Sequence, residues 1–324
     1  MLNLTNTLSK QGNLVSINAK GKRFVTHNGV FHADDVVAAA LLCFLYSSEI
    51  VRTRETRDSD FLFDVGGSFD PEAGHFDHHQ RNFDLHWFID GEEACKMATA
   101  GIVWEYFGKE YITKILALEN IQDAQFVPAI HDAIRPFMFY VDAIDVGRGD
   151  LAFTEQGQET FSQIISQMNA LNAYDVTEQA ACFDDAVSCV LRILRQKVLF
   201  EWNRLNFLAV MDEAVQKYAD SDILVLDTFG PWIEYAINHW QETEHFKLAI
   251  YPSGGSYRVQ TFPKNPEVRQ SMRCPAPEEW RGLKGEDLVS LTGIPDLVFV
   301  HGTGFIGGAG TRKSALHMAE RWIA

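Results

Sequence analysis

Segments with the character of strands and helices alternate along the first third of the chain, and this alternation restricts the fold more than any other feature of the sequence. Strands are expected at Arg23–His27, Ile50–Thr56 and Phe61–Val65. Helices are expected at Asp34–Ser47 and Cys95–Phe107. Strands that alternate with helices are typical of an α/β domain with a mainly parallel sheet. We therefore expect this fold class for the N-terminal part of the chain.

The rest of the chain predicts a second, smaller α/β domain. A helical stretch almost free of helix breakers, Val176–Tyr218, is expected to end the first domain and lead into the second. Further strands are expected at 222–226, 246–251, 257–262 and 297–301, and further helices at 232–240 and 311–322. We accordingly divide the chain into a polar, frayed leader at residues 1–21, a first domain at 22–200 and a C-terminal domain at 201–324.

Length and composition exclude several classes of protein. With 324 residues, of which 46% are apolar, the chain can bury a sizeable core and is not disordered throughout. The longest apolar run, Val36–Tyr46, has 11 residues, whereas a membrane span needs roughly 20. We therefore expect no membrane-spanning segment and no membrane partner.

Cysteine usage and the N-terminus bear on the compartment. The five cysteines form no CxxC pair, so we expect neither a disulfide framework nor a cysteine-rich zinc module. A reducing compartment fits, and we place the protein in the cytoplasm. A mitochondrial location is the alternative, because residues 1–33 contain no acidic residue, as in many transit peptides.

The net charge of −16 argues against a protein that coats nucleic acid through a broad basic face. It does not exclude a nuclease whose acidic groups hold metal ions, because bound cations change the local sign of the charge. The charge is also uneven: residues 258–324 carry a net charge of +2, and the other 257 residues carry −18. We therefore expect any anion-binding surface to lie near the C-terminus.

Histidine and aspartate gather near the N-terminus in a pattern typical of metal sites. Six of the 11 histidines lie between residues 27 and 86. Imidazole and carboxylate ligands together suit Mn, Zn or Fe. His27 and Asp64 each end a predicted strand, and Asp77-His78-His79 follows Asp64 after a single connecting turn. Because ligands bind outside the carboxyl ends of the strands in open α/β sheets, we expect these groups to converge on one crevice.

Five motifs, taken in their order along the chain, resemble one known family. They are Thr26–His32, Asp64–Gly67, Phe76–Arg81, Trp280–Leu283 and Gly304–Gly308. They look like the melanocyte-proliferating-gene exonuclease family of the DHH phosphoesterase superfamily, which includes the RecJ exonucleases and the family II inorganic pyrophosphatases. The resemblance implies a DHH-type catalytic domain over residues 22–200, with the active site in the cleft between it and a substrate-binding C-terminal domain.

The resemblance also implies two divalent metal ions, with Mn preferred to Mg or another divalent cation. The first motif reads His32-Ala33-Asp34 where the superfamily usually has Asp-x-Asp, which favours the softer Mn. Asp64 would bridge the two ions. The remaining ligands would be His27 and His32 for one ion, and Asp34, His78 and Asp142 for the other. Asp145, one helical turn after Asp142, is the less favoured ligand.

Three more residues receive roles through the same resemblance. His79 would face the substrate phosphate. Asp77 would orient a histidine, since imidazoles that bind metal usually donate their other N–H to a carboxylate. Arg81 is expected either to clamp a phosphate or to be a solvated surface arginine.

The glycine-rich segment Gly302–Gly310 suggests an anion site, because it follows a predicted strand and precedes a predicted helix. Backbone N–H groups in such a loop, together with the helix N-terminus, can bind a phosphate. We assign Gly307, Gly308 and Arg312 to substrate binding, with Arg258 as a further candidate. Arg312 lies in the first helical turn, where a cation does not suit the helix dipole, and a bound phosphate would explain it. A glycine-rich turn with solvated cations is the alternative.

The sequence thus predicts a Mn-dependent 3′–5′ exonuclease that hydrolyses single-stranded RNA or short oligonucleotides by two-metal catalysis. The alternative enzyme is a small-molecule phosphohydrolase acting on pyrophosphate or a nucleotide, which the acidic charge keeps open. A third hypothesis is a non-catalytic metal-binding or regulatory protein, and the complete ligand set argues against it. A homodimer is among the assemblies that we consider.

Overall fold

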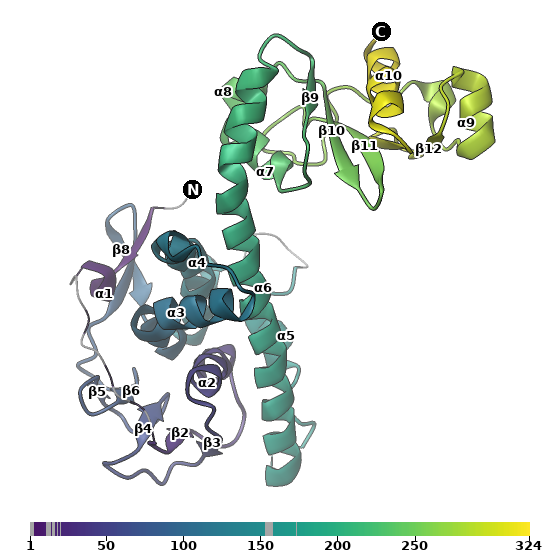
Figure 1. Cartoon of the computed structure of the whole chain (residues 1–324). Coiled ribbons are helices and arrows are strands. Elements are labelled where there is room, and N and C mark those ends of the chain that lie inside the picture. The colour runs from purple at the N-terminus through teal and green to yellow at the C-terminus, as the bar shows by residue number, and fades with distance from the viewer. Residues whose placement is uncertain are drawn as a thin grey trace. The chain divides into compact units, whose positions relative to one another are not determined.

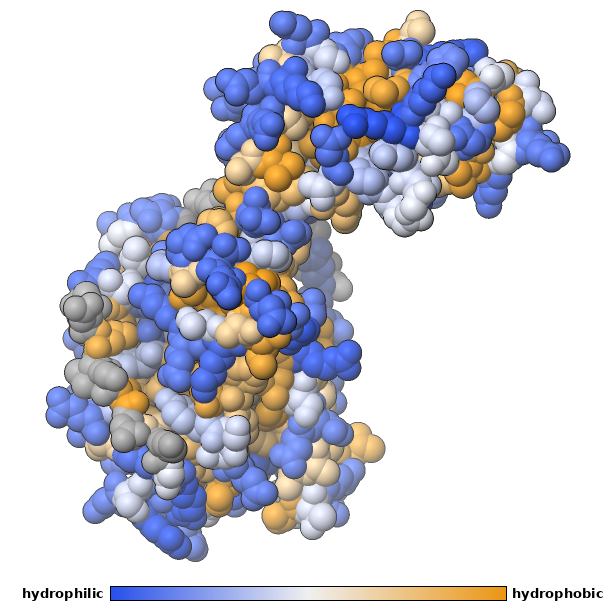
Figure 2. Space-filling view, viewed as in Figure 1, coloured by the Kyte–Doolittle hydropathy of each residue, from blue (hydrophilic) through white to orange (hydrophobic). Residues whose placement is uncertain are grey.

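Two units, Met1–Trp202 and Asn203–Ala324, make up the chain, and the boundary between them falls within the longest helix, α6 (Val176–Lys217). The computed structural model describes residues 3–10, 14, 17, 19, 21–152, 158–172 and 174–324. Each unit contains helices and a sheet of its own, so both are mixed α/β (Figure 1). In the view of Figure 2, hydrophilic residues cover most of the surface drawn, with apolar patches between them.

A five-stranded sheet organises the first unit. Its strands run in the order β3 (Ile50–Arg52), β2 (Phe24–Thr26), β4 (Phe61–Phe63), β6 (His75–Phe76) and β5 (Phe69–Asp70). All neighbours are parallel except β5 and β6, so the expected mainly parallel sheet is present. Phe24, Phe61 and Phe76 come from three neighbouring strands and are fully buried, with ring centroids 4.9 and 5.1 Å apart in turn. This row of aromatic side chains fixes the register of the strands that lead to the site.

Helices α2, α3 and α4 pack on one another beside this sheet (Figure 1). The helices of the first unit are α1 (Thr7–Lys10), α2 (Ala33–Tyr46), α3 (Thr99–Leu118), α4 (Val127–Asp145), α5 (Phe161–Ser166) and the N-terminal part of α6, with short 3-10 turns at Ala124–Phe126 and Gly149–Leu151. The central run of α2, residues 36–42, is buried all round. A helix that is apolar on every side requires cover on every side, and α3, α4 and α5 contribute to it.

A small antiparallel sheet corrects two expectations about the first unit. It consists of β1 (Leu4–Asn6), β7 (His86–Ile89) and β8 (Glu92–Lys96). The expected frayed leader is therefore wrong for residues 4–10, because β1 pairs with β7 and Leu8 of α1 is buried. The helix expected from Cys95 begins only at Thr99, because Cys95 pairs with Trp87 across the hairpin. In both places strand pairing overrides the local sequence pattern.

The second unit is built on a sheet with the strand order β12 (Leu297–Val300), β13 (Ile306–Ala309), β11 (Ser256–Thr261), β10 (Leu248–Ser253) and β9 (Ile223–Val225). Only β9 and β10 are parallel. Its helices are α7 (Trp232–Asn238), α8 (Trp240–Thr243), α9 (Gly285–Thr292) and α10 (Arg312–Ile323), with a 3-10 turn at Glu278–Trp280. The elements expected between residues 222 and 322 are confirmed within a few residues, although the helix expected at 232–240 is split into α7 and α8.

Both faces of the second sheet are covered. Met318 and Trp322 of α10 pack with Val259 on one face. On the other face, Trp232 of α7 and Met211 of α6 pack in a cluster with residues of β9 and β10. Two apolar faces that are each buried by helices give this unit a core of its own.

Residues 306–309 of the glycine-rich segment near the C-terminus form a strand and not a loop. Gly307 and Gly308 lie in β13, which pairs with β11 on one side and β12 on the other. A Cβ on Gly307 would lie 2.4 Å from the side chain of Met318, and one on Gly308 would lie 2.8 Å from the ring of Phe299. The glycines therefore allow α10 and Phe299 to approach β13 closely, which is a packing requirement.

Two further findings concern the cysteines and the helices. All five cysteines are free thiols. Among the helices of the described residues, none combines the length and apolar character that crossing a membrane requires.

Candidate metal centre

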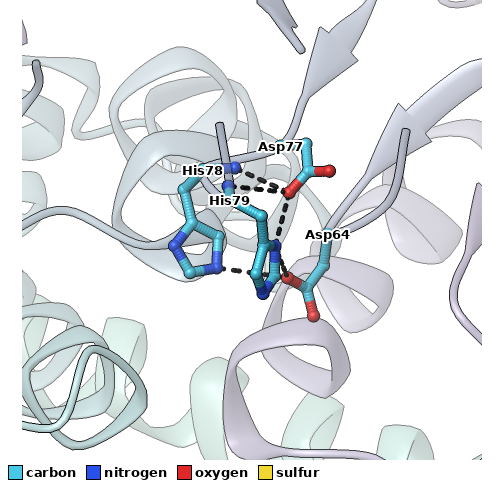
Figure 3. Close-up of side chains that lie close together, drawn as sticks. All are labelled: Asp64, Asp77, His78 and His79. Carbon is cyan, nitrogen blue, oxygen red and sulfur yellow. Dashed lines mark hydrogen bonds and ion pairs between the residues drawn. The ribbon is translucent and has the colours of Figure 1, made fainter. Parts of the chain in front are cut away.

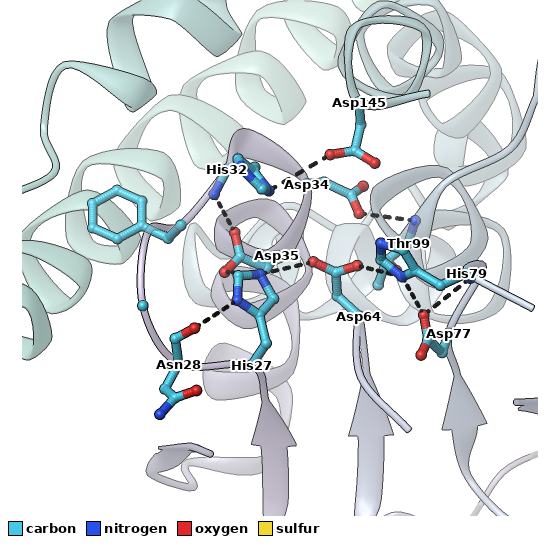
Figure 4. Close-up of polar contacts among 12 residues, drawn as sticks. His27, Asn28, His32, Asp34, Asp35, Asp64, Asp77, His79, Thr99 and Asp145 are labelled. Carbon is cyan, nitrogen blue, oxygen red and sulfur yellow. Dashed lines mark hydrogen bonds and ion pairs between the residues drawn. The ribbon is translucent and has the colours of Figure 1, made fainter. Parts of the chain in front are cut away.

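Three parallel strands of the first unit end at one group of polar side chains. His27 follows β2, Asp64 follows β4, and Asp77 follows β6. Figure 4 shows the strands ending at these three residues, with α2 and its acidic side chains above them. Because the carboxyl ends of parallel strands meet at one edge of a sheet, segments far apart in sequence come together there.

Asp64 lies at the centre of the group and faces a histidine with each carboxylate oxygen. Its Oδ2 is 3.2 Å from His27 Nε2, and its Oδ1 is 3.2 Å from His78 Nε2. The backbone of Asp64 has a φ of 54°, an uncommon conformation for a residue other than glycine. Burial by itself would raise the pKa of Asp64, but hydrogen bonds from the two histidines lower it below its ordinary range. Asp64 therefore carries its charge at neutral pH.

The first cluster of candidate ligands consists of His27, His32 and Asp64, which each offer a ligand atom within 4.8 Å of the others. His32 precedes α2 as its N-cap, and its backbone N–H donates to Asp35 Oδ1 at 2.9 Å. The other carboxylate oxygen, Asp35 Oδ2, is buried without a hydrogen-bond partner, 3.4 Å from His27 Nε2. Burial and the charge of Asp64 raise the pKa of Asp35 to about 7.

The second cluster consists of Asp34, His78 and Asp145. The Nε2 atom of His78 lies 3.7 Å from Asp34 Oδ2 and 3.4 Å from Asp145 Oδ2. Asp34 also accepts hydrogen bonds from the backbone N–H groups of Thr99 and Ala100, the first turn of α3. Burial and the neighbouring carboxylates raise the pKa of Asp34 well above its ordinary value. Such crowding of carboxylates is costly without a compensating cation.

Asp142, the expected ligand, lies outside both clusters. Its carboxylate accepts hydrogen bonds from Trp87 Nε1 at 2.8 Å and from the backbone N–H of Gly101 at 2.9 Å. It thus binds the N-terminus of α3, where the dipole favours a negative group, and burial raises its pKa to about 7. Asp145, one turn further along α4, is the residue that meets His78. Asp145, and not Asp142 as preferred from the sequence, therefore lies among the candidate ligands.

Asp77 organises the two histidines that follow it. Its Oδ1 accepts hydrogen bonds from the backbone N–H groups of His78 and His79 and from the ring Nδ1 of His79, the last at 2.7 Å (Figure 3). The side chain of Asp77 is buried, whereas that of His79 is 61% exposed. The hydrogen bond to Asp77 raises the pKa of His79 to about 9, although partial burial opposes the shift. His79 is thus a cation with an exposed ring beside Asp64.

Side chains from distant segments hold the loop between His27 and His32. The amide of Asn169 forms two hydrogen bonds with the backbone of Phe31. Gln179 Nε2 and Arg52 Nη2 both donate to the carbonyl of Gly29, at 3.0 and 2.7 Å. No motif marks Asn169, Gln179 or Arg52, and their partners lie far away in the sequence, so their role could not be predicted from it.

The other predicted site residues lie elsewhere. Arg81 is exposed after the histidine pair. In the second unit, Arg258 is the cross-strand partner of Gly308, and its guanidinium lies 5.6 Å from the centre of the Phe299 ring. Arg312 pairs with Asp227 at 2.9 Å, which by itself explains a cation in the first turn of α10.

The two clusters fit divalent cations by their chemistry. Each combines imidazole nitrogen with carboxylate oxygen, a donor set that suits Mn or Zn. Asp64 contributes to the first cluster and lies 3.2 Å from His78 in the second, so one carboxylate can serve both. The unpartnered oxygen of Asp35 and the raised pKa of Asp34 are further signs that positive charge belongs here.

Comparisons with known proteins give a consistent family. Residues 23–323 match the model of the family MYG1_exonuc, described as uncharacterised protein family UPF0160. The chain is 34% identical over 325 residues to the MYG1 exonuclease of Rattus norvegicus, which covers 93% of this chain and 84% of the rat protein. It is 32% identical to the MYG1 exonuclease of Homo sapiens, covering 93% and 86%. It is 31% identical to the MYG1 protein C694.04c of Schizosaccharomyces pombe, covering 92% and 96%.

Among solved structures, the chain is similar to that of RecJ from Thermus thermophilus in complex with Mn²⁺, with 11% identity and a TM-score of 0.25. The match covers 94% of this chain and spans about half (51%) of the RecJ chain.

Proposed function

The chain belongs to the MYG1_exonuc family, uncharacterised protein family UPF0160, and from this membership we propose that it is a metal-dependent nuclease that hydrolyses phosphodiester bonds. Relatives that cover most of the chain carry the name exonuclease, which supports a nucleic-acid substrate. The observation that carries the proposal is the position of Asp64, which places one carboxylate oxygen 3.2 Å from His27 and the other 3.2 Å from His78. Two neighbouring ligand clusters, with a carboxylate between them that can reach both, are the arrangement that two-metal hydrolysis requires.

We assign His27, His32 and Asp64 to one divalent cation, and Asp34, His78, Asp145 and again Asp64 to the other. Mn²⁺ is the cation that we propose first, because it accepts both imidazole and carboxylate. Bound there, the cations would activate water and offset the negative charge on the phosphoryl oxygens. Asp142 becomes a positioning residue. It accepts a hydrogen bond from the first turn of α3, the same turn whose backbone N–H groups donate to Asp34.

His79 and Asp77 complete the proposed catalytic group. His79 is exposed and protonated at neutral pH, so it can donate a hydrogen bond to a phosphate oxygen of the substrate. Asp77 keeps its ring in one orientation. In the hydrolysis, water adds to phosphorus, the bond from phosphorus to the 3′-oxygen of the preceding nucleotide breaks, and that oxygen receives a proton.

The finer proposal is a 3′–5′ exonuclease that acts on single-stranded RNA or short oligonucleotides and releases nucleoside 5′-monophosphates. Arg81 and Arg258 are our candidates to bind substrate phosphates. Arg312 would first have to leave Asp227. We no longer assign this role to Gly307 and Gly308, because β13 is paired on both sides within the sheet.

The test uses the purified full chain with Mn²⁺ and 5′-labelled single-stranded RNA. A ladder that shortens stepwise, disappears with EDTA and slows with a 3′-phosphate is expected. Asp64→Asn should abolish the reaction, whereas Asp70→Asn, which removes an exposed carboxylate six residues later, should leave it unchanged. Cuts in circular RNA would reject an exonuclease. Hydrolysis of pyrophosphate but not RNA would favour the small-molecule alternative, to which the net charge of −16 is better suited.

A further inference from the structure

A pocket of about 320 Å³ opens directly beside the metal centre, within the first unit. One end is formed by the three candidate ligands His32, Asp34 and Asp145. The walls come from α2, α4 and α5, through Ala33, Val141, Ile144, Ser162, Gln163 and Ser166. A volume of this size lies within the range of small-ligand sites.

The walls of the pocket offer no cationic side chain that could bind a phosphate group. All nine lining residues belong to the described part of the chain, and none of them is Lys or Arg. Apart from the candidate ligands, the lining consists of apolar side chains and of two hydroxyls and one amide on α5. Hydroxyl and amide groups recognise neutral polar ligands, and the apolar groups pack against flat or hydrocarbon surfaces. A sugar with its base offers both kinds of surface.

A second compartment continues the pocket along α4. It shares Val141, Ile144 and Ser162 with the first and has a volume of about 190 Å³. Its lining adds three aromatic rings, Phe137, Tyr140 and Phe161. Phe137 and Phe161 lie edge to face, with ring centroids 4.8 Å apart. Aromatic side chains that line a cavity suit the stacking of a nucleobase.

A capping box fixes the N-terminus of helix α5, which carries the polar side chains of the pocket. Thr160 caps it and accepts from the backbone N–H of Gln163, while Gln163 Oε1 accepts from the backbone N–H of Thr160 at 2.8 Å. This capping box uses the carbonyl oxygen of the Gln163 side chain and leaves the amide nitrogen as the group it can offer to a ligand.

We infer that this pocket binds the nucleoside of the terminal nucleotide while its 5′-phosphate lies on the metal centre. The sugar meets the polar side chains of α5 next to the metal ligands, and the base extends toward Tyr140 and Phe161. This inference rests on the proposed function, since it names the part of the substrate that the site recognises. It assigns a substrate-binding role to α5, which carries none of the motif residues.

Two small substrates with the same leaving group test the inference. The p-nitrophenyl ester of uridine 5′-monophosphate carries a nucleoside, and methyl p-nitrophenyl phosphate has a methyl group in its place. Ser162→Trp would fill the space shared by both compartments. Ile164→Trp is the matched control, because Ile164 lies on the same helix, is 48% exposed and lines neither compartment.

The parent protein and Ile164→Trp should hydrolyse the uridine ester with a kcat/KM about 10-fold or more above that of the methyl ester. Ser162→Trp should lose about 10-fold or more on the uridine ester and stay within about twofold of the parent on the methyl ester. An equal loss on both esters, or a preference that survives in Ser162→Trp, would overturn the inference.

Binding of uridine separates this inference from the proposed function. If the parent hydrolyses neither ester nor RNA, the proposed function fails, and the pocket is then judged by saturation-transfer NMR with uridine alone. A signal with the parent and Ile164→Trp that is lost in Ser162→Trp supports the nucleoside pocket. The same signal in all three proteins, or none in the parent, rejects it.

Discussion

The side-chain amide of Asn169 binds both backbone polar groups of Phe31, a residue 138 positions earlier in the chain. The N–H of Phe31 donates to Asn169 Oδ1 and the Nδ2 of Asn169 donates to the Phe31 carbonyl, each at 2.9 Å. Phe31 immediately precedes His32 and lies in the loop after His27. One amide therefore fixes the loop that carries both histidines of the first ligand cluster, in the way that a neighbouring strand would.

Asn169→Ala should weaken the binding of Mn²⁺ by about 10-fold, because partners that orient metal ligands typically contribute 10- to 100-fold to affinity. Calorimetric titration of the metal-free protein measures this. Asn172→Ala is the control, since Asn172 is exposed and its side chain accepts only from the nearby backbone N–H of Tyr174 among the contacts described. Equal affinity in Asn169→Ala and the parent would show that the loop is positioned without Asn169.

Asp64→Asn should reduce bound Mn²⁺ from two ions per chain toward zero, because Asp64 belongs to the first cluster and its Oδ1 lies 3.2 Å from His78 of the second. His27→Ala should leave about one ion, since it belongs to the first cluster alone. Metal analysis after dialysis gives the stoichiometry, with Asp70→Asn as the control of equal charge. Two ions retained in Asp64→Asn would remove Asp64 from the centre.

Substitution of Asp142 should lower the stability of the protein, whereas substitution of Asp145 should weaken metal binding. Asp142→Ala leaves the buried N–H groups of Trp87 and Gly101 without their acceptor and should cost about 1–3 kcal/mol of unfolding free energy. Asp145→Ala should change the stability of the metal-free protein by less than about 1 kcal/mol and lower Mn²⁺ binding instead. Urea denaturation in EDTA and metal titration measure the two effects. The reverse pattern would restore Asp142 as the ligand.

The imidazole of His79 in the metal-free protein should titrate at a pKa of about 9, because of its hydrogen bond to Asp77. A histidine pKa raised in the folded state adds stability that is fully present below the ordinary value of 6.5 and is lost as the pH rises through about 9. Asp77→Asn should move the pKa of His79 down toward 6.5, as NMR titration of the ring protons will show. Asp84→Asn, which removes an exposed carboxylate nearby, should not. An unchanged pKa of His79 in Asp77→Asn would show that Asp77 does not raise it.

The sequence alone determined the order of the elements that form the candidate metal centre. The strands before His27 and Asp64 are short apolar runs, and the helix after His32 is an apolar run with acidic residues at its start, so each is set by neighbouring residues. Parallel strands present their carboxyl ends at one edge, and this rule was enough to expect one crevice. These features could be predicted because each depends on a few adjacent residues and on a general property of sheets.

The tertiary structure alone decided which residues fill the site and which support it. Asp142 and Asp145 lie one helical turn apart, and the sequence favoured Asp142 as the ligand. The packing of α4 on α3 directs Asp142 to the helix N-terminus and Asp145 to His78. The glycines of β13 had the composition of a loop, but pairing on both sides made them a strand. Asn169 meets Phe31 only because the chain between them has folded. Each of these outcomes depends on contacts between distant segments, whose free energy of packing and hydrogen bonding outweighs the weak local preferences that a sequence pattern records.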